Sequence, residues 1–180
     1  MQYFKHMIHF SFFLLLVGTL AACASTDGNS DSADNMEIYE VHRDGRINVF
    51  YNQKLYKEFL ALGETPYRLT RIGAGPNGET LVFGLTKNDK KMKNPVAAIE
   101  LYDGKSTQDS IYGEMVKHNR VYVFSNFKDM NTVRSFGHPN YMYTMIGAGP
   151  KGETVVFVLN KKNKKKRPDA LIAKYKEHNT

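Results

Sequence analysis

The chain contains the stretch Ile72-Gly-Ala-Gly-Pro-Asn-Gly-Glu-Thr80 and repeats it 74 positions later as Ile146-Gly-Ala-Gly-Pro-Lys-Gly-Glu-Thr154. The same offset aligns residues 40–93 with residues 114–167 without a gap. After one deletion, an offset of 73 matches Pro95, Ile99 and Tyr102 with Pro168, Ile172 and Tyr175. Chance does not produce such a match, so the sequence predicts a duplicated unit: repeat 1 over 37–102, a polar linker over 103–110 and repeat 2 over 111–180.

Each copy predicts a hairpin and then a helix. Residues 46–51 and 120–125 are rich in β-branched and aromatic side chains, which favours strands, and a turn at 43–45 predicts a hairpin with 37–42. Asn52 and Asn126 stand where a helix N-cap is expected, ahead of apolar residues that recur every three positions. Gly63 and Gly137 then end these helices.

The second part of each copy surrounds the glycine-rich stretch. Strands are predicted over 67–72 and 141–146 before it, and over 80–85 and 154–159 after it, and short helices follow over 95–102 and 168–178. The later strands are almost continuously apolar, which indicates burial on both faces, by helices on one and by the other copy's sheet on the other. The predicted fold is α+β: two tandem β-β-α-β-β-α repeats with antiparallel sheets packed with pseudo-twofold symmetry.

The glycine-rich stretches also satisfy G-x-G-x-x-G, the pattern of dinucleotide-binding loops. In those loops the glycines open a helix, whose amino end faces the pyrophosphate. Here Thr-Leu-Val-Phe and Thr-Val-Val-Phe follow, which are strand-forming residues. Pro76 and Pro150 suit the first corner of a β-turn, and Gly78 and Gly152 suit a left-handed residue at its end. The motif is therefore predicted to be a hairpin turn, and no nucleotide cofactor is expected.

The amino terminus indicates a targeting signal. Residues 8–22 form a largely apolar run, which is shorter than the roughly 20 residues that span a bilayer as a helix. The run ends in Leu20-Ala21-Ala22-Cys23, and Cys23 is the single cysteine among 180 residues, so no intramolecular disulfide forms. This arrangement resembles the lipobox of bacterial lipoproteins. An ordinary secretory signal or a short membrane helix is the alternative.

The resemblance implies how the protein is attached. In bacterial lipoproteins the cysteine sulfur receives a diacylglycerol, the signal (1–22 here) is removed, and the new amino terminus is acylated, typically with palmitate. Residues 23–36 would then form a flexible tether, since 24–35 carry no large apolar side chain. The expected location is the cell envelope, with the membrane as partner. Because Ala24 follows the cysteine instead of Asp, the expected site in a cell with two membranes is the outer membrane, facing the periplasm.

Positive charge is concentrated in the second copy. The whole chain carries +7, residues 37–110 hold 11 basic and 10 acidic side chains, and residues 111–180 hold 13 and 5. A basic loop, defined by Lys161, Lys162, Lys164, Lys165, Lys166 and Arg167, accounts for much of this excess and matches a milder run at 87–93. It is the candidate anion-binding site, for anionic lipid, lipopolysaccharide or wall polymer; nucleic acid is not expected in this compartment. The alternative is a solvated loop without a partner.

Catalytic and metal signals are sparse. There is no G-x-S-x-G elbow, and Glu79 and Glu153 are expected to flank the turns instead of acting as acid and base. Histidines and methionines that suit metals occur without ligand spacing, so no metal or other cofactor is predicted. With 42% hydrophobic and 24% charged residues the chain is globular, and the predicted function is a non-catalytic binding or scaffold module. The alternatives are a small-ligand or metal-binding accessory lipoprotein that uses the groove between repeats, and an unrecognised hydrolase.

Overall fold

The computed structural model describes residues 36–179, and the account below concerns those residues. They fold into eight strands, four α-helices and one 3-10 turn. In chain order the elements are β1 (Met36–Arg43), β2 (Arg46–Phe50), α1 (Gln53–Leu62), β3 (Tyr67–Arg71), β4 (Thr80–Leu85), η1 (Asp89–Lys91), α2 (Ala97–Tyr102), β5 (Ser110–Lys117), β6 (Arg120–Asn126), α3 (Phe127–Phe136), β7 (Tyr141–Met145), β8 (Thr154–Leu159) and α4 (Asp169–Asn179).

All eight strands belong to one mixed sheet, with the order β3-β4-β2-β1-β5-β6-β8-β7. The hairpin pairs β1/β2, β3/β4, β5/β6 and β7/β8 are antiparallel. The pairs β2/β4, β6/β8 and the central pair β1/β5 are parallel. The prediction of purely antiparallel, separately packed sheets is therefore wrong.

The chain path explains the parallel pairs. After β2, the chain leaves the sheet through α1, forms the outer strand β3, and turns back so that β4 lies beside β2 and runs in its direction. At the centre, β1 and β5 pair from Met36 with Ile111 to Val41 with Val116, which removes two exposed sheet edges at once. The apolar run of β4, buried from Leu81 to Leu85, has the composition of a parallel strand that is covered on both faces.

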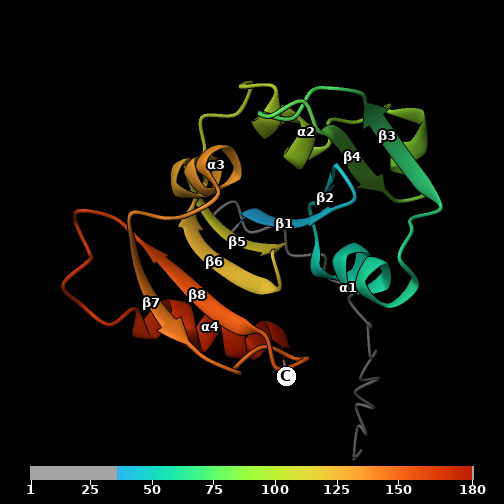
Figure 1. Cartoon of the computed structure of the whole chain (residues 1–180). Coiled ribbons are helices and arrows are strands. Elements are labelled where there is room, and N and C mark those ends of the chain that lie inside the picture. Colours follow the sequence, from blue (N-terminus) through green and yellow to red (C-terminus); the bar gives the residue numbers. More distant parts are fainter. Residues whose placement is uncertain (1–35, 180) are drawn as a thin grey trace, which may run out of the picture. The chain divides into compact units, whose positions relative to one another are not determined.

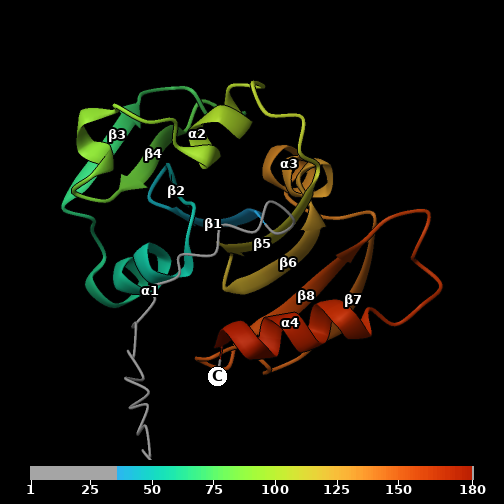
Figure 2. The same ribbon diagram turned by 180° about the vertical axis from the view of Figure 1, so that it is seen from behind.

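Helices cover both faces of the sheet. On one face, α2 and α3 pack over a core that includes Ile38, Phe83 and Phe124. On the other face, α1 and α4 pack over a second core that includes Tyr39 and Phe157. Figures 1 and 2 show α2 and α3 on one side of the central strands and α1 and α4 on the other. The second covering layer is thus helical, contrary to the expectation that another sheet would supply it.

The predicted helix ends are confirmed. The side chain of Asn52 accepts a hydrogen bond from the Leu55 amide at 2.9 Å, and that of Asn126 accepts one from the Asp129 amide at 2.8 Å. These bonds satisfy amide groups that have no partner inside the helix. At the other ends, Gly63 and Gly137 adopt left-handed conformations with φ of 80° and 86°.

The glycine-rich stretches are hairpin turns, as predicted. They join β3 to β4 and β7 to β8, and neither opens a helix. In the first turn, the amide of Gly75 donates to the carbonyl of Glu79 at 2.9 Å, and the carboxylate of Glu79 accepts from the amide of Asn77 at 2.8 Å. A Cβ at residue 75 would lie 2.6 Å from that carboxylate, so the closed turn requires glycine there.

Candidate functional site

Two buried glutamates occupy matching positions in the central strands. Glu40 lies in β1 and Glu114 in β5, 74 residues apart, and their exposed fractions are 0% and 1%. The sheet register places Glu40 beside Met115 and Glu114 beside Tyr39, so the two carboxylates occupy neighbouring strands. Glu40 faces α2 and α3, whereas Glu114 faces the α1 and α4 side. Because buried carboxylates need partners, their surroundings decide what each does.

Glu40 has a full set of partners. Its Oε1 accepts from the Nε atom of Arg134 at 2.9 Å, from Arg134 Nη2 and from the Tyr102 hydroxyl. Its Oε2 accepts from His42 Nε2 at 2.7 Å. Burial opposes ionisation, but the guanidinium of Arg134 and the bond from His42 outweigh it and lower the pKa of Glu40 to about 2. This is a closed, satisfied ion pair of α3 with β1.

The guanidinium of Arg134 is itself held from several sides. Its Nη2 donates to the Tyr102 hydroxyl at 2.6 Å, and its Nη1 donates to the side chain of Asn131. The guanidinium carbon lies 4.2 Å from the ring centroid of Tyr102 and 5.2 Å from that of Phe127. Arg134 is 5% exposed, so this cation is almost fully removed from water and depends on these partners.

Glu114, in contrast, is half satisfied. Its Oε1 accepts from the Tyr112 hydroxyl at 2.5 Å and from the amide of Asn179 at 2.8 Å. Its Oε2 is buried and has no hydrogen-bond partner among the described residues. Burial raises the pKa of Glu114, while Tyr112, Asn179, Tyr56 and Lys57 act in the opposite direction without cancelling it. A buried carboxyl oxygen without a partner is rare and marks a place where an interaction is missing.

Glu114 lines a partly open pocket of about 240 Å³. Tyr56, Phe59 and Leu60 of α1 form one wall, and the turn after β5 and the second glycine turn form the others. Residues from both the N-terminal and the C-terminal part of the described chain therefore line this pocket. Side chains from Arg43, Lys117, Lys151 and Glu153 also line it. We take this hollow, with Glu114, as the candidate site and call it the Glu114 pocket.

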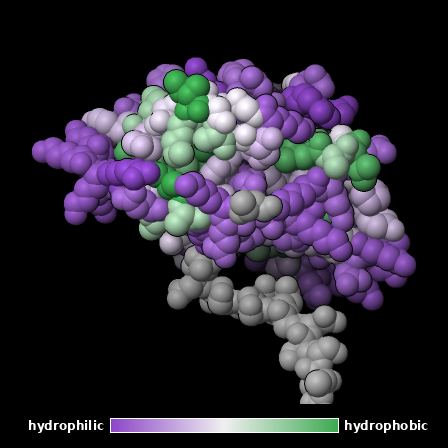
Figure 3. Space-filling view, turned by 90° about the horizontal axis from the view of Figure 1, so that it is seen from below, coloured by the Kyte–Doolittle hydropathy of each residue, from purple (hydrophilic) through white to green (hydrophobic). Residues whose placement is uncertain are grey.

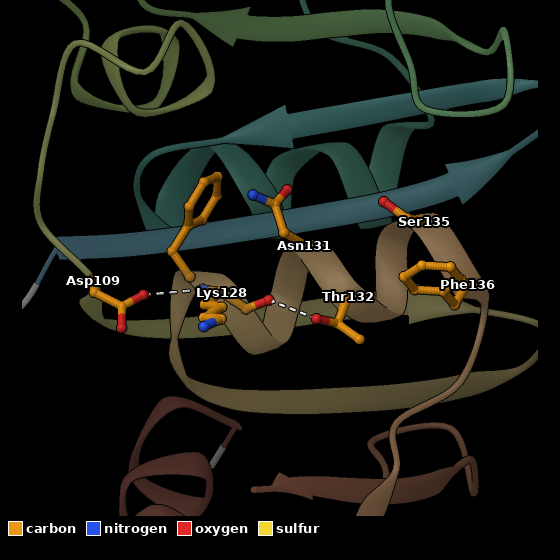
Figure 4. A pocket seen from close by; sticks show the side chains of 7 residues that line it. Asp109, Lys128, Asn131, Thr132, Ser135 and Phe136 are labelled. Atoms are coloured by element: carbon orange, nitrogen blue, oxygen red, sulfur yellow. Dashed lines mark hydrogen bonds between the residues drawn. The ribbon is translucent and has the colours of Figure 1, made fainter.

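A larger hollow beside α3 offers less chemistry. Its volume is about 550 Å³, and it is lined by α3 side chains and by Asp109 (Figure 4). Asp109 accepts from the amide of Lys128 at 3.0 Å, and Thr132 donates to the Lys128 carbonyl at 3.0 Å. These polar groups are therefore already used within the chain, and the hollow is open to solvent.

The basic loop connects β8 with α4. Two of its six cations contact other side chains of the protein. Lys164 donates to the Tyr141 hydroxyl at 3.2 Å and lies over that ring, and Arg167 lies over Tyr143 and pairs with Asp169 at 3.3 Å. All six cations are exposed, including the other four, Lys161, Lys162, Lys165 and Lys166. The face seen in Figure 3 is mostly hydrophilic and carries separate apolar patches.

The predicted lipid-attachment residue and the possible metal ligands do not contribute to a site among the described residues. Cys23 is outside the described residues. No helix within 36–179 is long and apolar enough to cross a membrane. Over the same span, no group of three or more histidines, cysteines or acidic residues is arranged to hold a metal ion. Met115 and Met130 belong to one core, whereas Met145 packs against the other.

Comparisons with protein-family models, with curated proteins and with solved structures gave no significant match for this chain.

Sequence reasoning missed the two glutamates. It considered Glu79 and Glu153, which the structure assigns to turn closure: Glu153 accepts from the Lys151 amide at 2.7 Å, as Glu79 does from Asn77. A signal for the buried pair was present, because Glu40 and Glu114 align at the 74-residue offset and stand inside otherwise apolar strands. A charged residue at the same register of two buried strands indicates a specific partner at each.

Proposed function

We propose that this protein is a non-catalytic, lipid-anchored binding module of the cell envelope, and that the Glu114 pocket is its ligand site. The observation that carries the proposal is the Glu114 carboxylate: it is buried, lines a partly open pocket and keeps one oxygen without a hydrogen-bond partner among residues 36–179. Pockets with few, well-placed polar groups are typical ligand sites. The lipid on Cys23 would hold the module at the membrane through the tether 24–36.

Binding is favoured over catalysis by the groups around the carboxylate. They are the phenols of Tyr56, Tyr112 and Tyr175 and the amide of Asn179. Burial raises the pKa of all three tyrosines, so they stay neutral near pH 7. Neutral phenols and an amide position and recognise a ligand, but none of them is an activated nucleophile.

The two halves are proposed to be copies related by an internal twofold axis along the central strands. The strand order is the same when read from either edge, if each strand is exchanged for its counterpart in the other half. The corresponding helices α1 and α3 cover opposite faces, as do α2 and α4. Parallel pairing of β1 with β5 fits such an axis, because rotation about a line parallel to the strands keeps their direction and exchanges the faces.

The pocket is tested by screening for ligands that raise the melting temperature of the purified mature protein. We expect that compounds which stabilise the wild type lose their effect in a Glu114→Gln variant, since the variant keeps the shape and removes the charge. The matched control is Glu153→Gln, which removes a carboxylate at the same pocket whose hydrogen bond goes to the chain itself. Ligands that stabilise wild type and Glu114→Gln equally would place the binding site elsewhere.

The basic loop supports a second contact, with anionic envelope material. Five exposed lysines in six residues attract anions within about 10 Å at ordinary salt, and each contributes about 1 kcal/mol near an anionic surface. Replacing Lys161, Lys162, Lys165 and Lys166 with Gln is expected to abolish most binding to phosphatidylglycerol vesicles in a flotation assay of the unlipidated protein. The control replaces the four lysines of the matching run, Lys87, Lys90, Lys91 and Lys93. Equal losses in both variants would show a net-charge effect without a site.

A further inference from the structure

We propose that the Glu114 pocket binds the cationic end of a small zwitterionic molecule: a guanidinium or primary ammonium group that faces Glu114, with an anionic group toward the pocket mouth. This inference rests on the proposed ligand site and names its chemistry. The other half of the same chain contains the filled version of the site.

The residue that binds Glu40 differs from the residue at the matching position of the other half. Arg134, which binds Glu40, corresponds at the 74-residue offset to Leu60. Leu60 is one of the residues that line the Glu114 pocket. Where one half supplies a guanidinium from α3, the other half therefore has a shorter, uncharged side chain on α1, which is 37% exposed, and a partly open pocket beside the carboxylate.

The side-chain oxygens that lack a hydrogen-bond partner belong to residues that match two partners of Arg134. Arg134 Nη2 donates to two acceptors, the Glu40 carboxylate and the Tyr102 hydroxyl. Their counterparts in the other half are Glu114 and, at an offset of 73, Tyr175. Within the described residues, the buried side-chain atoms without a hydrogen-bond partner are Glu114 Oε2 and the Tyr175 hydroxyl. Arg134 Nη2 thus binds a glutamate and a tyrosine in one half, and in the other half the matching glutamate and tyrosine each keep one side-chain oxygen without a hydrogen-bond partner among the described residues.

Glu114 also differs from Glu40 in its charged surroundings. No ion pair to Glu114 is present among residues 36–179, although Lys57 on α1 is near enough to favour its ionised form. Lys57 matches Asn131, which in the filled half only accepts a bond from Arg134. A carboxylate removed from water is stabilised most by a hydrogen-bonded cation, so the ligand supplies what the chain does not.

The basic side chains that line the pocket indicate the charge of the other end of the ligand. Arg43 and Lys151 are exposed and Lys117 is half-buried where they line the pocket, and the one further carboxylate there, Glu153, is engaged by the Lys151 amide. Three cations at the mouth repel a simple cation but attract an anionic group. The volume of about 240 Å³ is below the roughly 300–1,000 Å³ of drug-sized sites, which suits a small molecule.

The inference is tested by calorimetric titration of the detergent-solubilised, lipidated protein with three probes of similar shape. They are 4-guanidinobutyrate, which has both charges, 4-ureidobutyrate, which lacks the cation, and n-butylguanidine, which lacks the anion. We expect 4-guanidinobutyrate to bind and the ureido compound to bind about tenfold more weakly or worse. Butylguanidine should fall between them. The Glu114→Gln variant should lose the preference for the guanidinium.

A second variant fills the site from within. Leu60→Arg recreates the residue found at position 134, so it should raise the melting temperature and abolish binding of 4-guanidinobutyrate. The matched control is Leu62→Arg, which adds the same charge on α1 at a side chain that is 74% exposed; it should leave binding and melting temperature nearly unchanged.

The outcomes separate this inference from the proposed site. Equal affinity for the ureido and guanidino compounds, abolished by Glu114→Gln, overturns the cationic ligand and leaves the site in place. Failure of 4-guanidinobutyrate to bind at millimolar concentration, together with a lower melting temperature for Leu60→Arg than for Leu62→Arg, overturns the inference outright. Binding that Glu114→Gln does not change contradicts both.

Discussion

Replacing Arg134 with methionine will lower the free energy of unfolding by about 3–5 kcal/mol, which is the usual cost of removing one partner of a buried ion pair. Methionine has a similar volume, so the loss of packing is small. Glu40, with no exposed surface, would keep His42 and Tyr102 but lose its charged partner on α3. The cost arises because an uncompensated carboxylate must either stay charged away from water or take up a proton.

Urea denaturation at pH 7 measures this loss. The control is Lys128→Met, which removes an exposed cation from the same helix and should change stability by less than about 0.5 kcal/mol. The double variant Glu40→Gln, Arg134→Met should recover part of the loss, because neither charge then remains buried. A loss below 1 kcal/mol for Arg134→Met would contradict the description of the pair as a buried, mutually dependent unit.

The pH dependence gives an independent readout. The pKa of Glu40 is lowered from 4.5 to about 2 in the folded chain, so its contribution to stability is present above pH 4.5 and is lost as the pH falls toward 2. Without Arg134, burial keeps the pKa of Glu40 high. Lowering the pH then protonates the buried carboxylate, which removes the uncompensated charge and stabilises the variant. The difference in stability between wild type and Arg134→Met should therefore shrink between pH 5 and pH 2. Glu79, Asp89 and Asp103 also have lowered pKa values, but both proteins share them.

Replacing Cys23 with serine should release the protein from the membrane fraction. A serine hydroxyl does not take the place of the thiol in diacylglycerol transfer, so by the lipoprotein resemblance the variant would carry no acyl chain. Each buried methylene contributes about 0.8 kcal/mol to membrane binding, so two or three chains together hold a protein at the bilayer almost irreversibly. Without them, the contact proposed for the basic loop would remain, and such a contact is sensitive to salt.

Cell fractionation at 0.5 M salt and metabolic labelling with an alkyne fatty acid measure this change. Ser25→Ala is the matched control, since it alters the same polar segment and keeps the cysteine. Wild type and control should be labelled and sediment with the membranes, and Cys23→Ser should be unlabelled and remain in the supernatant. Unlabelled protein that still sediments with the membranes would favour a short membrane helix over the lipid anchor.

Local structure was predictable because its causes lie within a few residues. The side chains of Asn52 and Asn126 bond to amides three positions ahead, and Gly63 and Gly137 take conformations that other residues rarely adopt. The turn of 72–80 closes through its own glutamate. Helix ends, hairpins and the glycine turns therefore agreed with expectation to within one or two residues.

The arrangement of the sheet was not predictable in the same way. Whether β4 pairs with β2 in the parallel or the antiparallel sense depends on the direction in which the chain returns after α1. Either pairing would bury the same apolar run of β4. The pairing of β1 with β5 depends on the approach of segments about 70 residues apart. A pattern of alternating or continuous apolar residues reports how many faces a strand buries and leaves the identity of its neighbours open.

The sequence by itself showed that residues 40–93 match residues 114–167, predicted most of the helix ends and turns, and placed the single cysteine at the end of an apolar run that resembles a lipobox. Only the tertiary structure decided that Glu40 and Glu114, alike in sequence, differ in chemistry. The reason is that the state of a carboxylate depends on its surroundings: Arg134, 94 residues away in the chain, binds Glu40 from α3, whereas one oxygen of Glu114 has no hydrogen-bond partner among residues 36–179. Residues at matching positions thus form one closed ion pair and one candidate binding site because different side chains surround them.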